Sequence, residues 1–174
     1  SNIHSKDFSE ETYYQVIKQK TAALFEACAA IGTSSAGADD ETVENAKSFG
    51  RNLGIIFQIR DDIFDYYDQS KIGKPTGNDM VEGKLTLPVI YALNTTNDAE
   101  MIALAHKVKD GTVTKEEINR LVAFTKANGG IDYAEKRMWD FHAQSMALLD
   151  MDVEDGPVKD SLKAYLDYVI ERKK

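Results

Sequence analysis

One apolar pattern with the 3.6-residue period of an α-helix runs from Asp39 or Asp40 to about Tyr67. Gly50 and Gly54 lie inside it, and single glycines are tolerated within a helical pattern. No segment shows the alternation of apolar and polar residues that indicates a β-strand. A chain with so long an amphipathic helix and no strand pattern is predicted to be all-α, a helical bundle.

Shorter helices are predicted on both sides of this segment. Capping residues, prolines or glycines mark where they begin and end. Their predicted ranges are 9–31, 85–95, 114–127, 131–149 and 157–170. Ser9 suits an N-cap, Pro88 suits a first helical turn, and Thr114 with Glu117 has the spacing of a capping box. Residues 68–84 are rich in glycine and are predicted to be a loop.

Composition narrows the possible partners of the chain. Its 174 residues suffice for one domain with a core, so residues 1–174 are predicted to form a single all-α domain. The net charge of −8 argues against a nucleic-acid partner, which needs a basic face, and suits a protein that binds divalent cations.

The only cysteine, Cys28, excludes an intramolecular disulfide, and no apolar run is long enough to span a membrane. We therefore expect a cytoplasmic protein.

Four aspartates stand within eight positions at the end of the long helix: Asp61, Asp62, Asp65 and Asp68. Residues at i, i+4 and i+7 share a helix face, so three of these acids are aligned although like charges at that spacing repel. Arg60 is the only base inside the stretch. Two interpretations are open: a solvated acidic patch, or a site for a hard cation such as Mg²⁺, which prefers carboxylate oxygens.

The residues that follow favour the cation site. Lys74 and Lys84 come directly after the acids, in the glycine-rich segment. Lysines are point-charge partners for phosphate groups. Acids for a metal followed by bases for phosphates are typical of a site for a metal and a diphosphate.

These motifs resemble a known family. FQIRDDIFD followed by GKPTGNDMVEGKLTLP is similar to the second aspartate-rich region of the trans-isoprenyl (polyprenyl) diphosphate synthases, and YYQVIKQKTAALFEACAAIG resembles the preceding helix with its Lys-Thr pair. The resemblance implies the C-terminal part of the isoprenoid synthase fold. It also implies a Mg²⁺-dependent prenyltransferase of isoprenoid biosynthesis that condenses an allylic diphosphate with isopentenyl diphosphate, head to tail, and that is a homodimer or another homo-oligomer.

The resemblance implies metal-binding roles for three acids. Asp61 would bind Mg²⁺ that bridges to the allylic diphosphate. Asp62 and Asp65 would be further ligands or outer-shell partners.

It also implies substrate contacts. Lys20 and Lys74 would hold the allylic diphosphate, and Lys84 would lie at the mouth of that site. Thr21 and Gln58 would face the allylic carbon, where their oxygen dipoles stabilise the developing cation.

The chain departs from the family pattern because it contains only one of the two aspartate-rich regions and lacks the basic residues that bind isopentenyl diphosphate. We therefore expect it to be an incomplete domain, the C-terminal half of a prenyltransferase, and inactive alone. Helix faces that a complete enzyme buries, including Leu24, Ile56, Phe57 and Ile63, are then expected to be exposed and to favour self-association.

Two other functions stay open. A related class I terpene synthase or head-to-head synthase shares the aspartate motif, although the lysine segment argues against a terpene cyclase. A non-catalytic helical partner subunit is the second, and the intact set of motif residues argues against it. Residues 150–156 resemble the start of an EF-hand loop, but their glycine is misplaced and Ser161 stands where glutamate is required, so they are predicted to form an acidic turn.

Overall fold

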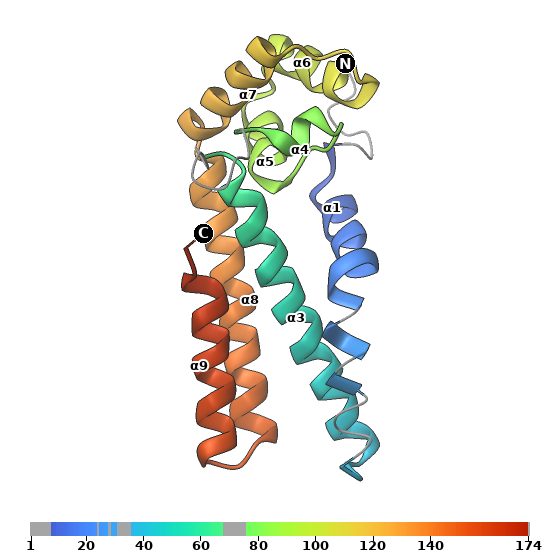
Figure 1. Cartoon of the computed structure of the whole chain (residues 1–174), viewed down its shortest axis with the longest axis vertical. Helices are drawn as coiled ribbons and strands as arrows, with labels where there is room; N and C mark the ends of the chain where they lie inside the picture. The colour runs from blue at the N-terminus through green and yellow to red at the C-terminus, as the bar shows by residue number, and fades with distance from the viewer. Residues whose placement is uncertain (1–7, 24, 28, 31–35, 68–75, 174) are drawn as a thin grey trace. The chain divides into compact units, whose positions relative to one another are not determined.

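The computed structural model describes residues 8–23, 25–27, 29–30, 36–67 and 76–173, and every regular element in them is helical (Figure 1). The elements are α1 (Glu10–Ile17), the π-helix η2 (Lys18–Ala22), α3 (Asp40–Phe64), α4 (Asn78–Val81), α5 (Leu87–Thr96), α6 (Ala99–Asp110), α7 (Lys115–Ala127), α8 (Gly130–Asp152) and α9 (Pro157–Glu171). The predicted all-α fold is confirmed.

The described chain divides into two compact units. Of the described residues, unit 1 holds 8–13, 61–67 and 76–136, and unit 2 holds 14–23, 25–27, 29–30, 36–60 and 137–173. The single domain expected for residues 1–174 stays a prediction. No helix in the described ranges is both long enough and apolar enough to cross a membrane.

The helix starts follow from local side chains, as the sequence indicated. The Thr12 N–H donates to Ser9 Oγ at 3.3 Å, and the Thr42 N–H donates to Asp39 Oδ1 at 2.8 Å. A proline, Pro88, lies in the first turn of α5, and the capping box of α7 is present.

Three elements differ from the prediction. Helix α6 was missed, although Asp98 caps it through the Met101 N–H at 3.0 Å and Gly111, with φ of 73°, ends it. Helix α3 ends at Phe64, three residues early. Residues 78–81 of the predicted loop form the short helix α4. Its first N–H groups donate to the Asp65 carboxylate, and the side chain of Met80 is buried.

In unit 1 the apolar helix α5 lies in the core. Its residues Leu87, Val89, Ala92 and Leu93 have no measurable exposure. Close approach at the start of α8 requires glycine, because a Cβ at Gly130 would lie 2.4 Å from the carbonyl oxygen of Pro88.

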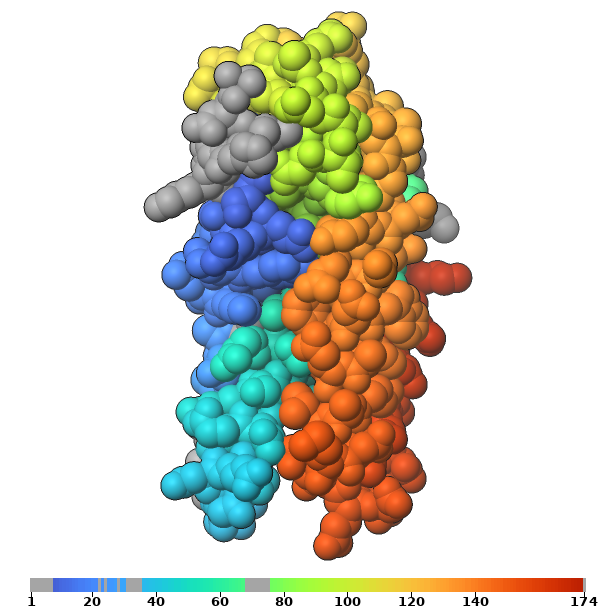
Figure 2. Space-filling model, turned by 180° about the vertical axis from the view of Figure 1, so that it is seen from behind, coloured from blue at the N-terminus to red at the C-terminus, as the bar shows by residue number. Residues whose placement is uncertain are grey.

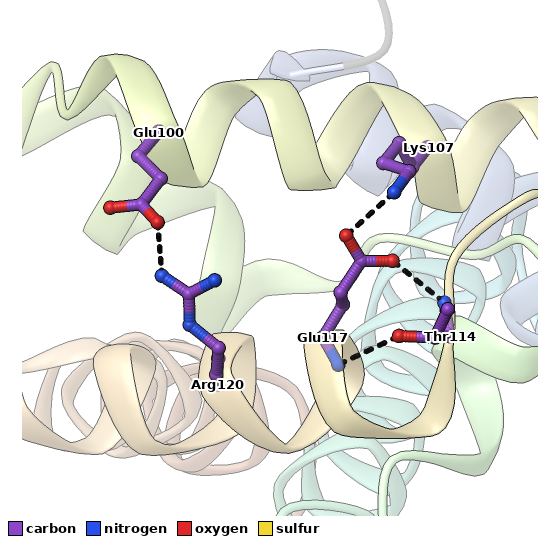
Figure 3. Close-up of polar contacts among 5 residues, drawn as sticks. All are labelled: Glu100, Lys107, Thr114, Glu117 and Arg120. Carbon is purple, nitrogen blue, oxygen red and sulfur yellow. Dashed lines mark hydrogen bonds and ion pairs between the residues drawn. The ribbon is translucent and has the colours of Figure 1, made fainter.

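Helices α6 and α7 of unit 1 are joined by two ion pairs (Figure 3). Lys107 Nζ lies 2.6 Å from Glu117 Oε2, and Arg120 pairs with Glu100. Glu117 also completes the capping box with Thr114, whose N–H donates to Glu117 Oε1 at 2.9 Å. The Lys107 contact, followed by the Thr114 N–H, lowers the pKa of Glu117 to about 2.

Unit 2 is built from long helices that contact one another in pairs. His142 of α8 lies 2.7 Å from Asp167 of α9. The Arg172 guanidinium lies 4.3 Å from the centroid of the Phe57 ring of α3 and donates to the Phe57 carbonyl at 3.2 Å. Much of the orange surface in Figure 2 belongs to α8.

The glycine at position 50 has a packing role that its sequence pattern did not indicate. A Cβ there would lie 2.5 Å from the carbonyl oxygen of Phe25 and 3.1 Å from Cβ of Ala29. Gly50 therefore lets the backbone at Phe25 and the side chain of Ala29 approach α3, and it is required at this position, not merely tolerated.

The apolar stripe expected to be exposed is largely covered. Ile56 is 0% and Ile63 is 2% exposed, and Phe57 is half-buried, while Leu24 lies outside the described residues. The expectation of exposed faces is wrong for the two isoleucines, because the chain itself buries them. Self-association remains a prediction, but exposed apolar faces at Ile56 and Ile63 no longer support it.

Residues 153–156, between α8 and α9, form the turn that the sequence predicted, and lysines pair with acids at the end of α8 and in this turn. Lys159 Nζ lies 2.9 Å from Asp155 Oδ1 and 3.1 Å from Asp150 Oδ1, and Lys163 Nζ lies 2.7 Å from the same Asp150 oxygen.

Candidate functional site

The end of α3, in unit 1, carries the aspartates that the sequence singled out. Asp62 is buried, and the Tyr13 hydroxyl donates a hydrogen bond to its Oδ2 atom. Asp61 is half-buried on the same turn. No sequence pattern marked Tyr13 as a partner of Asp62, because the two residues are 49 positions apart and only the fold brings them together. Asp68 lies outside the described residues.

Asp65 contacts the start of α4. Its Oδ1 atom accepts the Asn78 N–H and its Oδ2 atom accepts the Asp79 N–H, each at 3.1 Å. Its backbone carbonyl accepts the Gly77 N–H at 2.8 Å. Gly77 has φ of 80°, and a Cβ there would lie 2.5 Å from Ile118 Cγ2 of α7, so glycine is required at this turn.

Asp79 is a candidate that the sequence analysis missed. It is half-buried, and burial followed by the charge of Asp65 raises its pKa to about 6, while Lys84 acts in the opposite direction. A perturbed carboxyl beside other acids is typical of functional sites. The available signal was an acid inside a glycine-rich segment, directly after Gly77 and Asn78.

Lys84 lies close to these acids. It is exposed, its N–H donates to the Asp79 carbonyl at 2.8 Å, and its Nζ lies 3.1 Å from Glu82 Oε2. The Glu82 contact raises the pKa of Lys84, and the charges of Asp79 and Asp62 add to this effect. Lys74, the other predicted phosphate ligand of this segment, lies outside the described residues.

In unit 2, the predicted Lys-Thr pair lies on the π-helix η2. Lys20 is exposed, and the Thr21 hydroxyl donates to Gln58 Oε1 of α3 at 3.0 Å. π-Helical turns inside α-helices are frequent at functional sites. The structure thus joins two residues, Thr21 and Gln58, that the resemblance had assigned to one role.

Within the described ranges, no three histidine, cysteine, aspartate or glutamate side chains are arranged to enclose a metal ion. The donor chemistry nevertheless fits Mg²⁺. That ion binds proteins through one or two carboxylates and keeps its other positions for water and substrate phosphates. Asp61 and Asp62 supply carboxylates, and Asp79 adds a third acid of the same segment, whose pKa is raised by burial and then by the charge of Asp65.

Comparison with known proteins gives the family. Residues 1–125 match the family model described as Polyprenyl synthetase. The chain belongs to this family. The predicted relationship to the polyprenyl diphosphate synthases is confirmed, and its relatives are prenyltransferases.

Three relatives illustrate the similarity. The crystal structure of a geranylgeranyl pyrophosphate synthase from Bacteroides thetaiotaomicron has a TM-score of 0.92 and 51% identity, over 98% of this chain and 56% of that chain. A geranylfarnesyl diphosphate synthase from Aeropyrum pernix is 35% identical over 97% of this chain and 52% of its own length. A geranylgeranyl pyrophosphate synthase from Corynebacterium glutamicum, crystallised with calcium and isoprenyl diphosphate, has a TM-score of 0.77 and 32% identity, over 92% of this chain and 50% of that chain.

The chain spans about half the length of the curated relatives that it matches. The activity and substrates of a whole synthase are therefore proposals for this chain.

Proposed function

We propose that this chain supplies the allylic-diphosphate side of a polyprenyl diphosphate synthase, which transfers a prenyl group head to tail onto isopentenyl diphosphate. One arrangement in unit 1 carries the proposal: the last turn of α3 carries Asp61 and Asp62, and α4 carries Asp79. Lys84 follows α4, close enough to Asp79 and Asp62 for their charges to act on it. Carboxylates suit a cation and a lysine suits a phosphate, so this arrangement matches a metal-bound diphosphate.

We propose Mg²⁺ as the cation. Asp61 and Asp62 would hold it, with Asp79 close by. When bound, Mg²⁺ neutralises the charge that develops on a leaving diphosphate. The crystallisation of the Corynebacterium relative with calcium and isoprenyl diphosphate supports a divalent cation and this substrate class.

The other predicted residues of the chain would act on the substrate directly. Lys20, Lys74 and Lys84 would bind the diphosphate oxygens and disperse their charge as the carbon–oxygen bond breaks. Thr21 and Gln58 would direct oxygen dipoles at the allylic carbon, where positive charge develops. The double bond of isopentenyl diphosphate would then attack that carbon, and the carbocation that results would lose a proton to form the double bond of the product, so no side chain has to act as a nucleophile.

The test is a chimaera in which residues 1–174 replace the matching 56% of the Bacteroides synthase. We expect it to elongate an allylic diphosphate with radiolabelled isopentenyl diphosphate when Mg²⁺ is present. In the chimaera, Asp61→Ala should lower kcat about 100-fold or more, because a group that stabilises the transition-state charge is lost. The matched control is Asp110→Ala, at the exposed end of α6.

Elongation by the chimaera at a normal rate after Asp61→Ala would contradict the proposed metal role. A folded chimaera without any activity would instead favour a non-catalytic helical subunit. The cytoplasmic location and the homo-oligomer also remain proposals, and light scattering tests the second.

A further inference from the structure

The Asp65 side chain holds α4 in place with both of its carboxylate oxygens. These oxygens accept the N–H groups of Asn78 and Asp79, and the Asp65 carbonyl accepts the Gly77 N–H. An ionised acceptor makes stronger hydrogen bonds to N–H groups than a neutral one. Asp65 therefore ties the end of α3 to a segment that begins twelve positions later in the sequence.

Backbone hydrogen bonds of the same segment also link Asp65 to Lys84. Asp79 donates its N–H to Asp65, and its carbonyl accepts the Lys84 N–H at 2.8 Å. The buried Met80, 2% exposed, fixes the middle of the same short segment. The positions of Asp79 and Lys84 beside the acidic end of α3 thus depend on Asp65.

The same two hydrogen bonds make Asp65 a weaker metal ligand than a carboxylate without such donors, although each of its oxygens keeps a second lone pair. Each N–H group directs its positive end at a carboxylate oxygen, so both oxygens already have a donor that offsets their charge. A cation at this carboxylate would have to lie beside two amide hydrogens that carry partial positive charge.

We propose that Asp65 is a positioning residue, which sets Asp79 and Lys84 for a bound diphosphate by capping α4, and that it is not a metal ligand. This inference rests on the proposed function, since it assigns the third acid of the same site. In this assignment Asp61 and Asp62 would bind the cation, and Asp65 would position residues 78–84 beside it.

The experiment compares the parent chain with Asp65→Ala, Asp65→Asn and Asp61→Ala. Mn²⁺ binding is followed by electron paramagnetic resonance, the affinity for inorganic diphosphate is measured with Mn²⁺ present, and hydrogen exchange is measured at the amides of residues 78–84. Asp98→Ala is the matched control, because it removes a carboxylate cap from α6 in the same unit.

We expect Asp65→Ala to leave Mn²⁺ affinity within about twofold of the parent, while diphosphate affinity falls about tenfold and exchange at residues 78–84 quickens about tenfold, since two charge-assisted bonds are lost. Asp65→Asn should give intermediate values, because its amide has one acceptor oxygen. Asp61→Ala should weaken Mn²⁺ binding, and Asp98→Ala should change neither Mn²⁺ nor diphosphate affinity.

A loss of Mn²⁺ binding in Asp65→Ala as large as in Asp61→Ala would show that Asp65 is a ligand and overturn the inference. Unchanged exchange at residues 78–84 would overturn it as well. A parent chain that binds neither Mn²⁺ nor diphosphate would overturn the proposed function and this role with it, and the exchange data would still show separately whether the cap holds α4.

Discussion

The Thr21 hydroxyl donates its proton to Gln58 Oε1 at 3.0 Å, which joins the π-helix η2 to α3 within unit 2. This bond sets the hydroxyl hydrogen toward Gln58 and leaves the lone pairs of the threonine oxygen directed elsewhere. An oxygen dipole held in this way is pre-organised, which is what stabilisation of a developing cation requires.

We predict that Thr21→Val in the Bacteroides chimaera lowers kcat about tenfold with little change in KM, because the dipole acts mainly on the transition state. Steady-state kinetics with an allylic diphosphate check this. Thr12→Val, the same exchange earlier along the helical segment, is the control and should retain parental kcat. A rise in KM at constant kcat would mean that Thr21 binds the substrate and does not stabilise the cation.

We predict that Gly50→Ala destabilises the chain by about 1–3 kcal/mol, because the new Cβ would meet the Phe25 carbonyl oxygen at 2.5 Å. Helix propensity alone predicts the opposite, a gain of up to about 1 kcal/mol. Urea unfolding followed by circular dichroism distinguishes the two. Ser48→Ala, two positions earlier on α3, should change the free energy of unfolding by no more than about 0.5 kcal/mol.

We predict that Glu117 stabilises unit 1 in a pH-dependent way. Its folded pKa is about 2, below the ordinary value of 4.5, so its contribution is complete above pH 4.5 and is lost as the pH falls toward 2. The difference in unfolding free energy between the parent and Glu117→Gln should therefore be largest near pH 7 and shrink with acidification. Urea unfolding at several pH values measures it.

The matched control for this titration is Glu116→Gln, at the neighbouring exposed position. This variant keeps the capping box and the ion pair with Lys107, and it should change the free energy of unfolding at pH 7 by no more than about 0.5 kcal/mol. If the Glu117→Gln difference stayed constant from pH 7 to pH 3, the ion pair with Lys107 would not depress the Glu117 pKa in solution.

We predict that the 174-residue chain by itself shows no detectable prenyl transfer, because its sequence contains one aspartate-rich region and not the basic residues that hold isopentenyl diphosphate in the family. A radiolabel assay at high protein concentration tests this. Measurable elongation would show that one acidic region, alone or in a self-associated form, is sufficient.

The starts of three helices could be predicted from the sequence, because each depends on contacts within four residues, whereas the start of α6 at Asp98 was missed. Ser9 and Asp39 accept N–H groups three residues ahead, and Thr114 with Glu117 forms a reciprocal pair over the same distance. The family could also be predicted from the sequence, because the aspartate, lysine and threonine motifs are short, occur in a fixed order and lie close together.

The tertiary structure alone decided which of these residues meet. Asp79, Tyr13 and the packing role of Gly50 were not predicted, because their partners Asp65, Asp62 and Phe25 lie 14 to 49 positions away along the chain. A periodicity of apolar residues records which face of a helix is buried, but not which distant backbone approaches it. Helix α4 is the clearest case: four residues in a glycine-rich segment are too few to form a stable helix by propensity, and they do so because a carboxylate from the end of α3 accepts their N–H groups.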